Sequence, residues 1–154
     1  PSQRAFLRSM EKMRPYVCTA MAKGTNARPK HRAYILGRGE GIEAYTDGTT
    51  YIAIVDSVAE QMMKEGLPGF LRLAHLMVHE YLHDTEDTGS HAHDLEFMEA
   101  FHDIVLDSSD QLFAAATYGF NALVKENDKL SKKSAKQLDL IKRSEATAEA
   151  GPTA

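Results

Sequence analysis

The most informative stretch for the fold and function of this chain is Val78-His79-Glu80-Tyr81-Leu82-His83. A second stretch, His93-Asp94-Leu95-Glu96-Phe97, follows it ten residues later. Four residues of α-helix advance by about 400°, so His79 and His83 lie roughly 40° apart and one turn above each other. Both imidazoles can therefore reach one metal ion. Glu80 lies roughly 100° around the helix from His79, off the metal but close to a water in an open coordination position. This spacing predicts two metal ligands and a general base.

A catalytic zinc ion usually has three protein ligands and one open position, so the two histidines need a third partner. His93 is the first choice, because it begins a helical pattern after a loop that can fold back over the end of the preceding helix. Asp94 can then orient the ligating imidazole. His91 in the same loop is the alternative, and Glu96 or Glu99 would give a site of two histidines and one glutamate. The residues alone leave these alternatives open.

Apolar residues that recur every three or four positions predict several helices. The run from Phe70 to Val78 is apolar nearly all round, which is typical of a buried helix that delivers the two histidines to a cleft. A helix over residues 2–14 is expected to end at Pro15, and residues 23–30 are expected to form a loop. Further helices are predicted over residues 56–65, 93–106 and 110–124.

Three short segments have strand composition, namely residues 32–36, 42–45 and 49–55. Asp47-Gly48 marks a tight hairpin turn before the third segment. We expect a small antiparallel sheet of about three strands, packed on several helices that include the histidine-bearing helix, and hence an α+β fold. An extended peptide is expected to add to this sheet at an exposed edge over Thr50 to Val55.

The length of 154 residues and the hydrophobic content of 43% predict a single domain over residues 1–143, followed by a disordered tail over residues 144–154. The apolar runs are far shorter than the ~20 residues that a membrane helix needs, so no membrane partner is expected. The first residues lack the apolar core of a signal peptide, and the single cysteine, Cys18, cannot form an intrachain disulfide. These features predict a cytoplasmic protein.

The net charge of −4 conceals a strong asymmetry along the chain. Residues 1–38 carry nine Lys or Arg against one acid, residues 39–124 carry two against sixteen, and residues 125–154 carry seven against five. The basic N-terminal segment is expected to be solvated, to pack against the acidic body, or to bind a polyanion. Nucleic acid is therefore one expected partner, through this segment.

The pattern His79-Glu80-x-x-His83 followed by His93-Asp94-x-x-Phe97 resembles the zincin metallopeptidases of the SprT-like and WLM group. The resemblance implies a minimal zincin-like domain with bound Zn²⁺ and a protein or peptide substrate. It also implies four functional residues, the zinc ligands His79, His83 and His93 and the base Glu80. The loop before His93 is longer than in the family's pattern and carries an extra histidine, which leaves the third ligand open.

These observations predict a zinc-dependent metallopeptidase in which Glu80 assists the attack of a zinc-bound water on a peptide bond. The alternative is a zinc-stabilised binding or structural module without turnover. The segment Asp47-Gly48-x-x-Tyr51-Ile52-Ala53-Ile54, followed by the histidine pattern, also resembles the tail of larger phage or bacterial ATP-binding proteins. That second resemblance implies that the chain is one domain of a longer protein.

Overall fold

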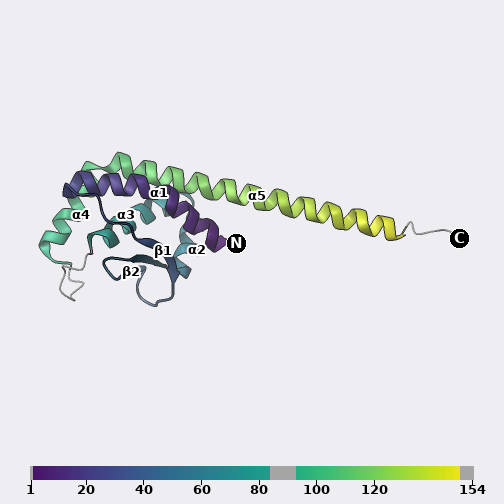
Figure 1. Cartoon of the computed structure of the whole chain (residues 1–154), viewed down its shortest axis with the longest axis horizontal. Coiled ribbons are helices and arrows are strands. Elements are labelled where there is room, and N and C mark those ends of the chain that lie inside the picture. The colour runs from purple at the N-terminus through teal and green to yellow at the C-terminus, as the bar shows by residue number, and fades with distance from the viewer. Residues whose placement is uncertain (1, 84–92, 150–154) are drawn as a thin grey trace. The chain divides into compact units, whose positions relative to one another are not determined.

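The computed structural model describes residues 2–83 and 93–149, which form five helices and a three-stranded sheet (Figure 1). The helices are α1 (Ser2–Thr25), α2 (Asp56–Glu65), α3 (Leu67–Leu82), α4 (Leu95–Asp107) and α5 (Ser109–Glu149). The strands are β1 (Ala33–Gly37), β2 (Ala44–Thr46) and β3 (Tyr51–Val55). The α+β class predicted from the sequence is confirmed. Backbone contacts divide the chain into two compact units, Pro1–Leu123 and Val124–Ala154.

The sheet has the strand order β1-β3-β2 and is mixed, so the expectation of an antiparallel sheet is wrong for one of its two pairings. β1 runs parallel to β3, with Tyr34 opposite Ile52, whereas β2 runs antiparallel to β3. The physical reason lies in β3, where all four residues from Ile52 to Val55 are buried. A strand that is apolar on both faces is stabilised most at the centre of a sheet. β3 therefore separates β1 from β2.

The central position of β3 also corrects the expectation about a peptide-binding edge. Both sides of Tyr51–Val55 are paired within the sheet, so this strand has no free edge to accept an extended peptide. The two edges belong to β1 and β2. The hairpin turn before β3 is confirmed, because Asp47 Oδ1 accepts hydrogen bonds from the backbone N–H groups of Thr49 (2.9 Å) and Thr50 (2.7 Å).

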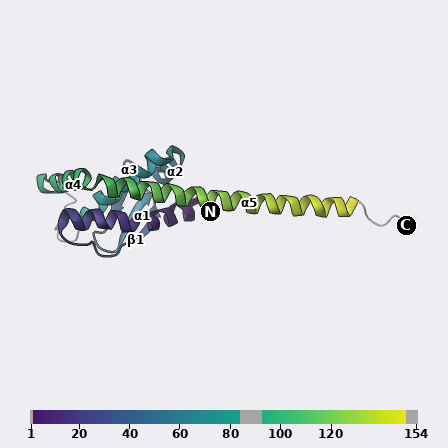
Figure 2. The ribbon, with the colours of Figure 1, turned by 90° about the horizontal axis from the view of Figure 1, so that it is seen from above.

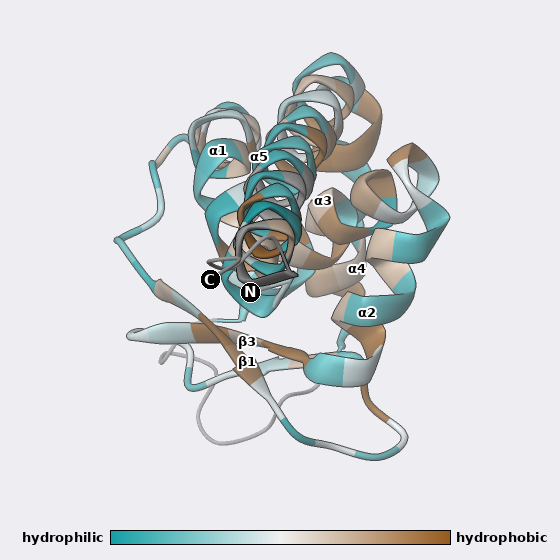
Figure 3. Cartoon of the chain, turned by 90° about the vertical axis from the view of Figure 1, so that its right-hand side faces the viewer, coloured by the Kyte–Doolittle hydropathy of each residue, from teal (hydrophilic) through white to brown (hydrophobic). Residues whose placement is uncertain are grey.

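Helices α1 and α3 cover one face of the sheet (Figure 3). From that face Tyr34, Ile52 and Ile54 enter the main hydrophobic core, while Ile35 of β1 remains 40% exposed on the other face. The core is completed by apolar residues of α1, α2, α3, α4 and the first part of α5. α1 and this part of α5 lie side by side (Figures 1 and 2), where the rings of Tyr16 and Tyr118 stack at 4.7 Å.

Helix α1 continues through Pro15 to Thr25, so the expectation that Pro15 ends the helix is wrong. A proline inside a helix costs about 3 kcal/mol. Val17 and Met21, which follow Pro15 on the buried side, are 0% and 3% exposed. Burying each of these side chains contributes about 1.5–3 kcal/mol, which offsets the proline when the helix continues. The proline itself lies on the exposed side.

The predicted loop over residues 23–30 begins only after Thr25, because Gly24 is the last but one residue of α1. A Cβ atom at Gly24 would lie 2.3 Å from Cγ1 of Ile104 in α4. The glycine thus allows α1 to approach α4 closely, and the structure uses its small size rather than its conformational freedom.

The second unit begins at Val124, and its described part is the C-terminal portion of α5. Residues 144–149 are helical, which corrects the expectation of a disordered tail there; residues 150–154 lie outside the described residues. No glycine or proline occurs between Gly119 and Gly151, and an ion pair joins Arg143 to Asp139 one turn away at 3.1 Å. Both features favour a helix. None of the described helices is long and apolar enough to cross a membrane.

Candidate metal centre

The predicted buried helix is confirmed as α3, and the half-buried His79 lies in its last turn. Phe70, Leu73, Ala74, Met77 and Val78 are all 0% exposed. His75, one turn before His79, directs Nδ1 at the carbonyl oxygen of Leu71 at 2.7 Å and is not part of the histidine cluster.

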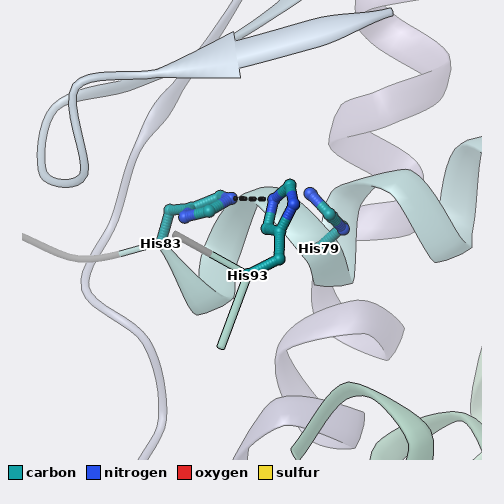
Figure 4. Close-up of side chains that lie close together, drawn as sticks. All are labelled: His79, His83 and His93. Atoms are coloured by element: carbon teal, nitrogen blue, oxygen red, sulfur yellow. Dashed lines mark hydrogen bonds between the residues drawn. The ribbon is translucent and has the colours of Figure 1, made fainter. Parts of the chain in front are cut away.

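Three histidines converge where α3 ends and α4 is about to begin (Figure 4). The possible ligand atoms of His79, His83 and His93 all lie within 4.8 Å of one another. Nε2 of His83 lies 3.1 Å from Nε2 of His93. A search of residues 2–83 and 93–149 for His, Cys, Asp and Glu side chains close enough to share a metal ion finds this one group. The two segments predicted from the sequence to share one site are therefore close together.

The sequence predicts that His83 lies in the same helix as His79, but in the structure it lies just past the last residue of α3. Its backbone is extended, with φ −75° and ψ 116°, yet its N–H still donates to the carbonyl oxygen of Glu80 at 3.2 Å. The side chain is only 5% exposed. His83 thus approaches the cluster from a helix terminus, and its position depends on what holds that terminus.

The structure distinguishes among the residues predicted as alternatives for the third metal ligand. His93 immediately precedes the cap of α4 and joins the cluster. Glu96 and Glu99 lie exposed on α4 and are not in the group. His91 lies outside the described residues. Of the alternatives that the structure describes, only His93 has its ligand atoms near those of His79 and His83.

Asp94 and Phe97 have structural roles in the cluster that the sequence pattern did not reveal. Asp94 is the N-cap of α4, and its Oδ1 accepts a hydrogen bond from the Phe97 N–H at 2.8 Å. This capping contact stabilises a helix start by about 1 kcal/mol. That Asp94 also orients the imidazole of His93 stays a prediction. The cap fixes the direction of α4, and α4 in turn presents Phe97 to the histidines.

The Phe97 ring is the common neighbour of all three imidazoles. Its centroid lies 4.6 Å from that of His83 in a stacked arrangement, 5.0 Å from that of His93 and 5.1 Å from that of His79. The side chain is 8% exposed. Phe97 therefore limits the orientations of the three rings, which accounts physically for a phenylalanine three residues after Asp94.

Burial determines the protonation of His79. Desolvation, reinforced by the neighbouring His93 and His83, lowers the pKa of His79 to about 4. The imidazole is consequently neutral at pH 7, which is the form that binds a metal ion. In the metal-free chain this shift contributes stability above the ordinary pKa of 6.5, and that stability is lost as the pH falls toward 4.

Burial acts in the opposite sense on the next residue. Glu80 is 4% exposed, and desolvation raises the pKa of its carboxyl to about 7, although the charge of Arg32 opposes the shift. Carboxylates with pKa values near 7 are concentrated at functional sites. Glu80 thus follows His79 in the helix and carries a buried carboxyl with a pKa near 7.

The shifted pKa of Glu80 predicts that Glu80→Gln stabilises the metal-free protein at neutral pH. Because the folded-state pKa is raised from 4.5 to about 7, ionisation of Glu80 destabilises the fold increasingly across this window. Replacing the carboxyl with a neutral amide should raise the free energy of unfolding by about 1–3 kcal/mol near pH 7.5 and by little near pH 4.5. Urea unfolding of both proteins in chelator measures the difference. The His79 contribution is present in both and cancels.

Arg32 holds the end of α3 and was not recognised as a site residue from the sequence. Its guanidinium is buried, at 5% exposure, and donates to the carbonyl oxygens of Glu80 (2.8 Å) and Tyr81 (3.3 Å). Carbonyls in the last turn of a helix have no partner within the helix, and a cation there also complements the helix dipole. In the sequence Arg32 is one of many cations in the basic segment, and nothing local distinguishes it.

A second group of contacts connects α3 to α1 and β1. The hydroxyls of Tyr34 and Tyr81 lie 2.6 Å apart, and Arg14 donates to the Tyr81 hydroxyl at 3.2 Å. The Arg14 guanidinium also lies 4.0 Å above the Tyr34 ring. Burial raises the pKa of Tyr81 to about 12, so this phenol stays neutral. Together with Arg32, this group fixes the part of α3 that carries Glu80 and leads into His83.

No protein-family model matches the chain, and neither a curated protein nor a solved structure does. The observations that bear on function are therefore those of the residues themselves. They provide three clustered imidazoles, one of which has a lowered pKa, and a buried carboxyl adjacent to the first of them in the helix. Such a donor set can bind a divalent transition metal.

Proposed function

We propose that this chain is a zinc-dependent peptidase of the zincin type, as its resemblance to the SprT-like and WLM peptidases implies. His79, His83 and His93 would hold the metal, and Glu80 would be the general base. The observation that carries the proposal is the group of three imidazoles whose ligand atoms lie within 4.8 Å of one another. Three histidines with one open position are a known ligand set of catalytic zinc.

The spacing within the cluster supports a common ion. Two nitrogens bound to one tetrahedral zinc at about 2.0–2.1 Å are separated by about 3.3 Å. The distance between Nε2 of His83 and Nε2 of His93 is 3.1 Å, close to this value. The donors are imidazoles, which zinc accepts in preference to the hydroxyl and amide oxygens of other side chains.

The proposed chemistry is hydrolysis of a peptide bond. A bound zinc ion would supply Lewis acidity that activates water and polarises a carbonyl. Glu80 would accept the proton of the attacking water and then deliver it to the leaving amine. In the metal-free chain burial raises the pKa of Glu80 to about 7, and a general base is most effective when its pKa lies near the operating pH. Arg32 and Phe97 would act as positioning residues for the helix end and for the imidazoles.

The test compares the wild-type chain with Glu80→Gln, both loaded with one equivalent of zinc. The wild type should cleave an unfolded protein substrate, and Glu80→Gln should lower the rate at least about 100-fold, because general-base catalysis contributes about 10²–10⁴-fold. Zinc content, measured by elemental analysis, should be equal in the two proteins. Peptide products are followed by mass spectrometry.

The matched control is Glu60→Gln, which neutralises an exposed carboxylate of α2 and should leave the rate unchanged. Cleavage that persists in Glu80→Gln would exclude Glu80 as the base. A zinc-loaded wild type that cleaves neither unfolded proteins nor peptide mixtures would refute the peptidase and favour the binding or structural module.

A further inference from the structure

The outer face of α4 exposes large apolar side chains. α4 packs on α1 and α3, and its buried residues are Phe97 and Ile104. On the other side of the helix Leu95 is 74% exposed, Met98 51% and Leu106 63%. Their spacing of three and eight residues places them within about 80° of one another around the helix. α4 therefore has an apolar side that no described element covers.

A line of carboxylates runs beside these apolar side chains. The acidic stripe consists of four exposed residues spaced by three or four positions, namely Glu96, Glu99, Asp103 and Asp107. It extends along about 16 Å of helix. Like charges three or four residues apart on one helix repel each other. A partner with cations at the same spacing would therefore stabilise α4.

The surrounding chain supplies few cations to this stripe. Neither α4 nor residues 84–92 contain a lysine or arginine. The two cations of residues 39–124, Lys64 and Arg72, pair with glutamates outside α4. Lys23 of α1 donates to the last backbone carbonyl of α4 at 3.0 Å. Among the residues that the structure describes, no ion pair includes a carboxylate of the stripe.

The part of α5 that belongs to the second unit carries a line of the opposite charge. The basic stripe consists of four exposed residues spaced by four, three and four positions, namely Lys125, Lys129, Lys132 and Lys136. It extends along about 16 Å of helix, the same length as the acidic stripe. Leu140, which is 63% exposed, follows one turn after the last of these lysines. This helix also combines a line of charge with an exposed apolar side chain.

The two stripes match each other in sign, length and spacing. Helices that lie side by side bury apolar residues between them and place opposite charges along the edges of the contact, which determines the choice of partner. A nucleic acid would satisfy only the basic stripe, and the sixteen acids of residues 39–124 would repel its phosphates. A second copy of this chain satisfies both stripes at once.

We propose that two copies of this chain associate by pairing the basic stripe of one with the acidic stripe of the other. Each copy carries both stripes, so the exchange is reciprocal and closes as a twofold dimer. Leu140 of one copy then packs against the exposed apolar side of α4 in its partner. The inference does not depend on the proposed peptidase function, and its test uses no measurement of activity.

The experiment measures the mass of the chain in solution by sedimentation velocity, in chelator so that metal ions cannot bridge copies. Over about 1–100 µM the wild type should show a reversible equilibrium between monomer and dimer. Raising NaCl from about 0.05 M to about 0.5 M should raise the Kd of the dimer at least about tenfold, because salt screens exposed charges. Leu140→Gln should also raise the Kd.

Charge reversal tests the pairing of the stripes directly. Lys129→Glu combined with Lys132→Glu should give a monomer, and so should Glu99→Lys combined with Asp103→Lys. An equimolar mixture of these two double variants should dimerise again, because each offers a stripe complementary to one on the other. Such rescue requires that the two stripes contact each other.

Two matched controls change the net charge equally at other exposed positions. Arg4→Glu combined with Lys12→Glu corresponds to the basic-stripe variant. Glu40→Lys combined with Glu60→Lys corresponds to the acidic-stripe variant. Both controls should keep the Kd of the wild type within about threefold. Circular dichroism and thermal unfolding verify that all four double variants are folded.

Three results would overturn the proposal. The first is a wild type that stays monomeric over the whole concentration range. The second is a dimer that neither reversal weakens, or reversed variants that remain monomeric when mixed. The third is a monomeric wild type that binds a DNA duplex through Lys129 and Lys132, which would assign the basic stripe to nucleic acid instead.

Discussion

Replacing His93 with alanine is expected to abolish stoichiometric zinc binding and peptide cleavage together. His93 contributes one of the three imidazoles whose ligand atoms lie within 4.8 Å. Changes to residues that merely support a metal ligand cost about 10–100-fold in affinity, so loss of a ligand should cost at least about 100-fold. Competition with a chromophoric chelator measures the affinity. Because His93 is exposed, the metal-free variant should unfold within about 0.5 kcal/mol of wild type.

Two companion variants make this result decisive. His102→Ala removes an exposed histidine of α4 outside the cluster and should retain one equivalent of zinc. His91→Ala tests the alternative third ligand, which lies outside the described residues. Stoichiometric zinc in His93→Ala together with its loss in His91→Ala would transfer the role to His91 and contradict the assignment made from the geometry.

Replacing Arg32 with methionine is expected to produce the largest loss of stability of any single polar substitution near the site. Methionine preserves much of the apolar stem but leaves the buried carbonyl oxygens of Glu80 and Tyr81 without the guanidinium. Each hydrogen bond to a charged group contributes about 1.5–3 kcal/mol, so loss of the two bonds should lower the free energy of unfolding by about 3–6 kcal/mol. Chemical unfolding of the metal-free proteins measures this.

Arg72→Met is the matched control, because Arg72 is half-exposed and forms surface ion pairs with Glu65 and Glu43. Such pairs contribute about 0–1 kcal/mol. Arg32→Lys retains the charge but not the two-pronged geometry and should be intermediate. In the surviving folded population of Arg32→Lys, zinc affinity should also decrease, since the end of α3 that leads to His83 is less restrained. Equal effects of Arg32→Met and Arg72→Met would show that Arg32 does not hold the helix end.

The histidine cluster could be predicted from the sequence because its signals are local. The four-residue spacing of His79 and His83 predicts that the two rings lie close together, and the structure places both near one point although His83 lies just past the end of α3. The helical apolar pattern predicted from His93 to Leu106 corresponds to α4, and His93 lies just before that helix. That these histidines bind zinc and that Glu80 is a base stay predictions, and the same holds for the peptidase activity.

The elements that were wrongly predicted depend on contacts between distant segments. Pro15 would end an isolated helix, but α1 continues because its later turns are buried in the core. The neighbours of a strand depend on which strand has two apolar faces to cover, so β3 occupies the centre and pairs in parallel with β1. The helix beyond residue 143 differs from these, since its composition favours a helix and the prediction of disorder underestimated that propensity.

By itself the sequence determined the α+β class, the hairpin at Asp47 and the helix that carries His79, because periodicity and turn chemistry act over a few residues. Only the tertiary structure decided how the site is supported. Arg32 at the end of α3 and Phe97 against the three imidazoles act through space, across separations that leave no pattern in the chain. The pKa values of His79 and Glu80 were decided in the same way, since desolvation depends on everything packed around a side chain.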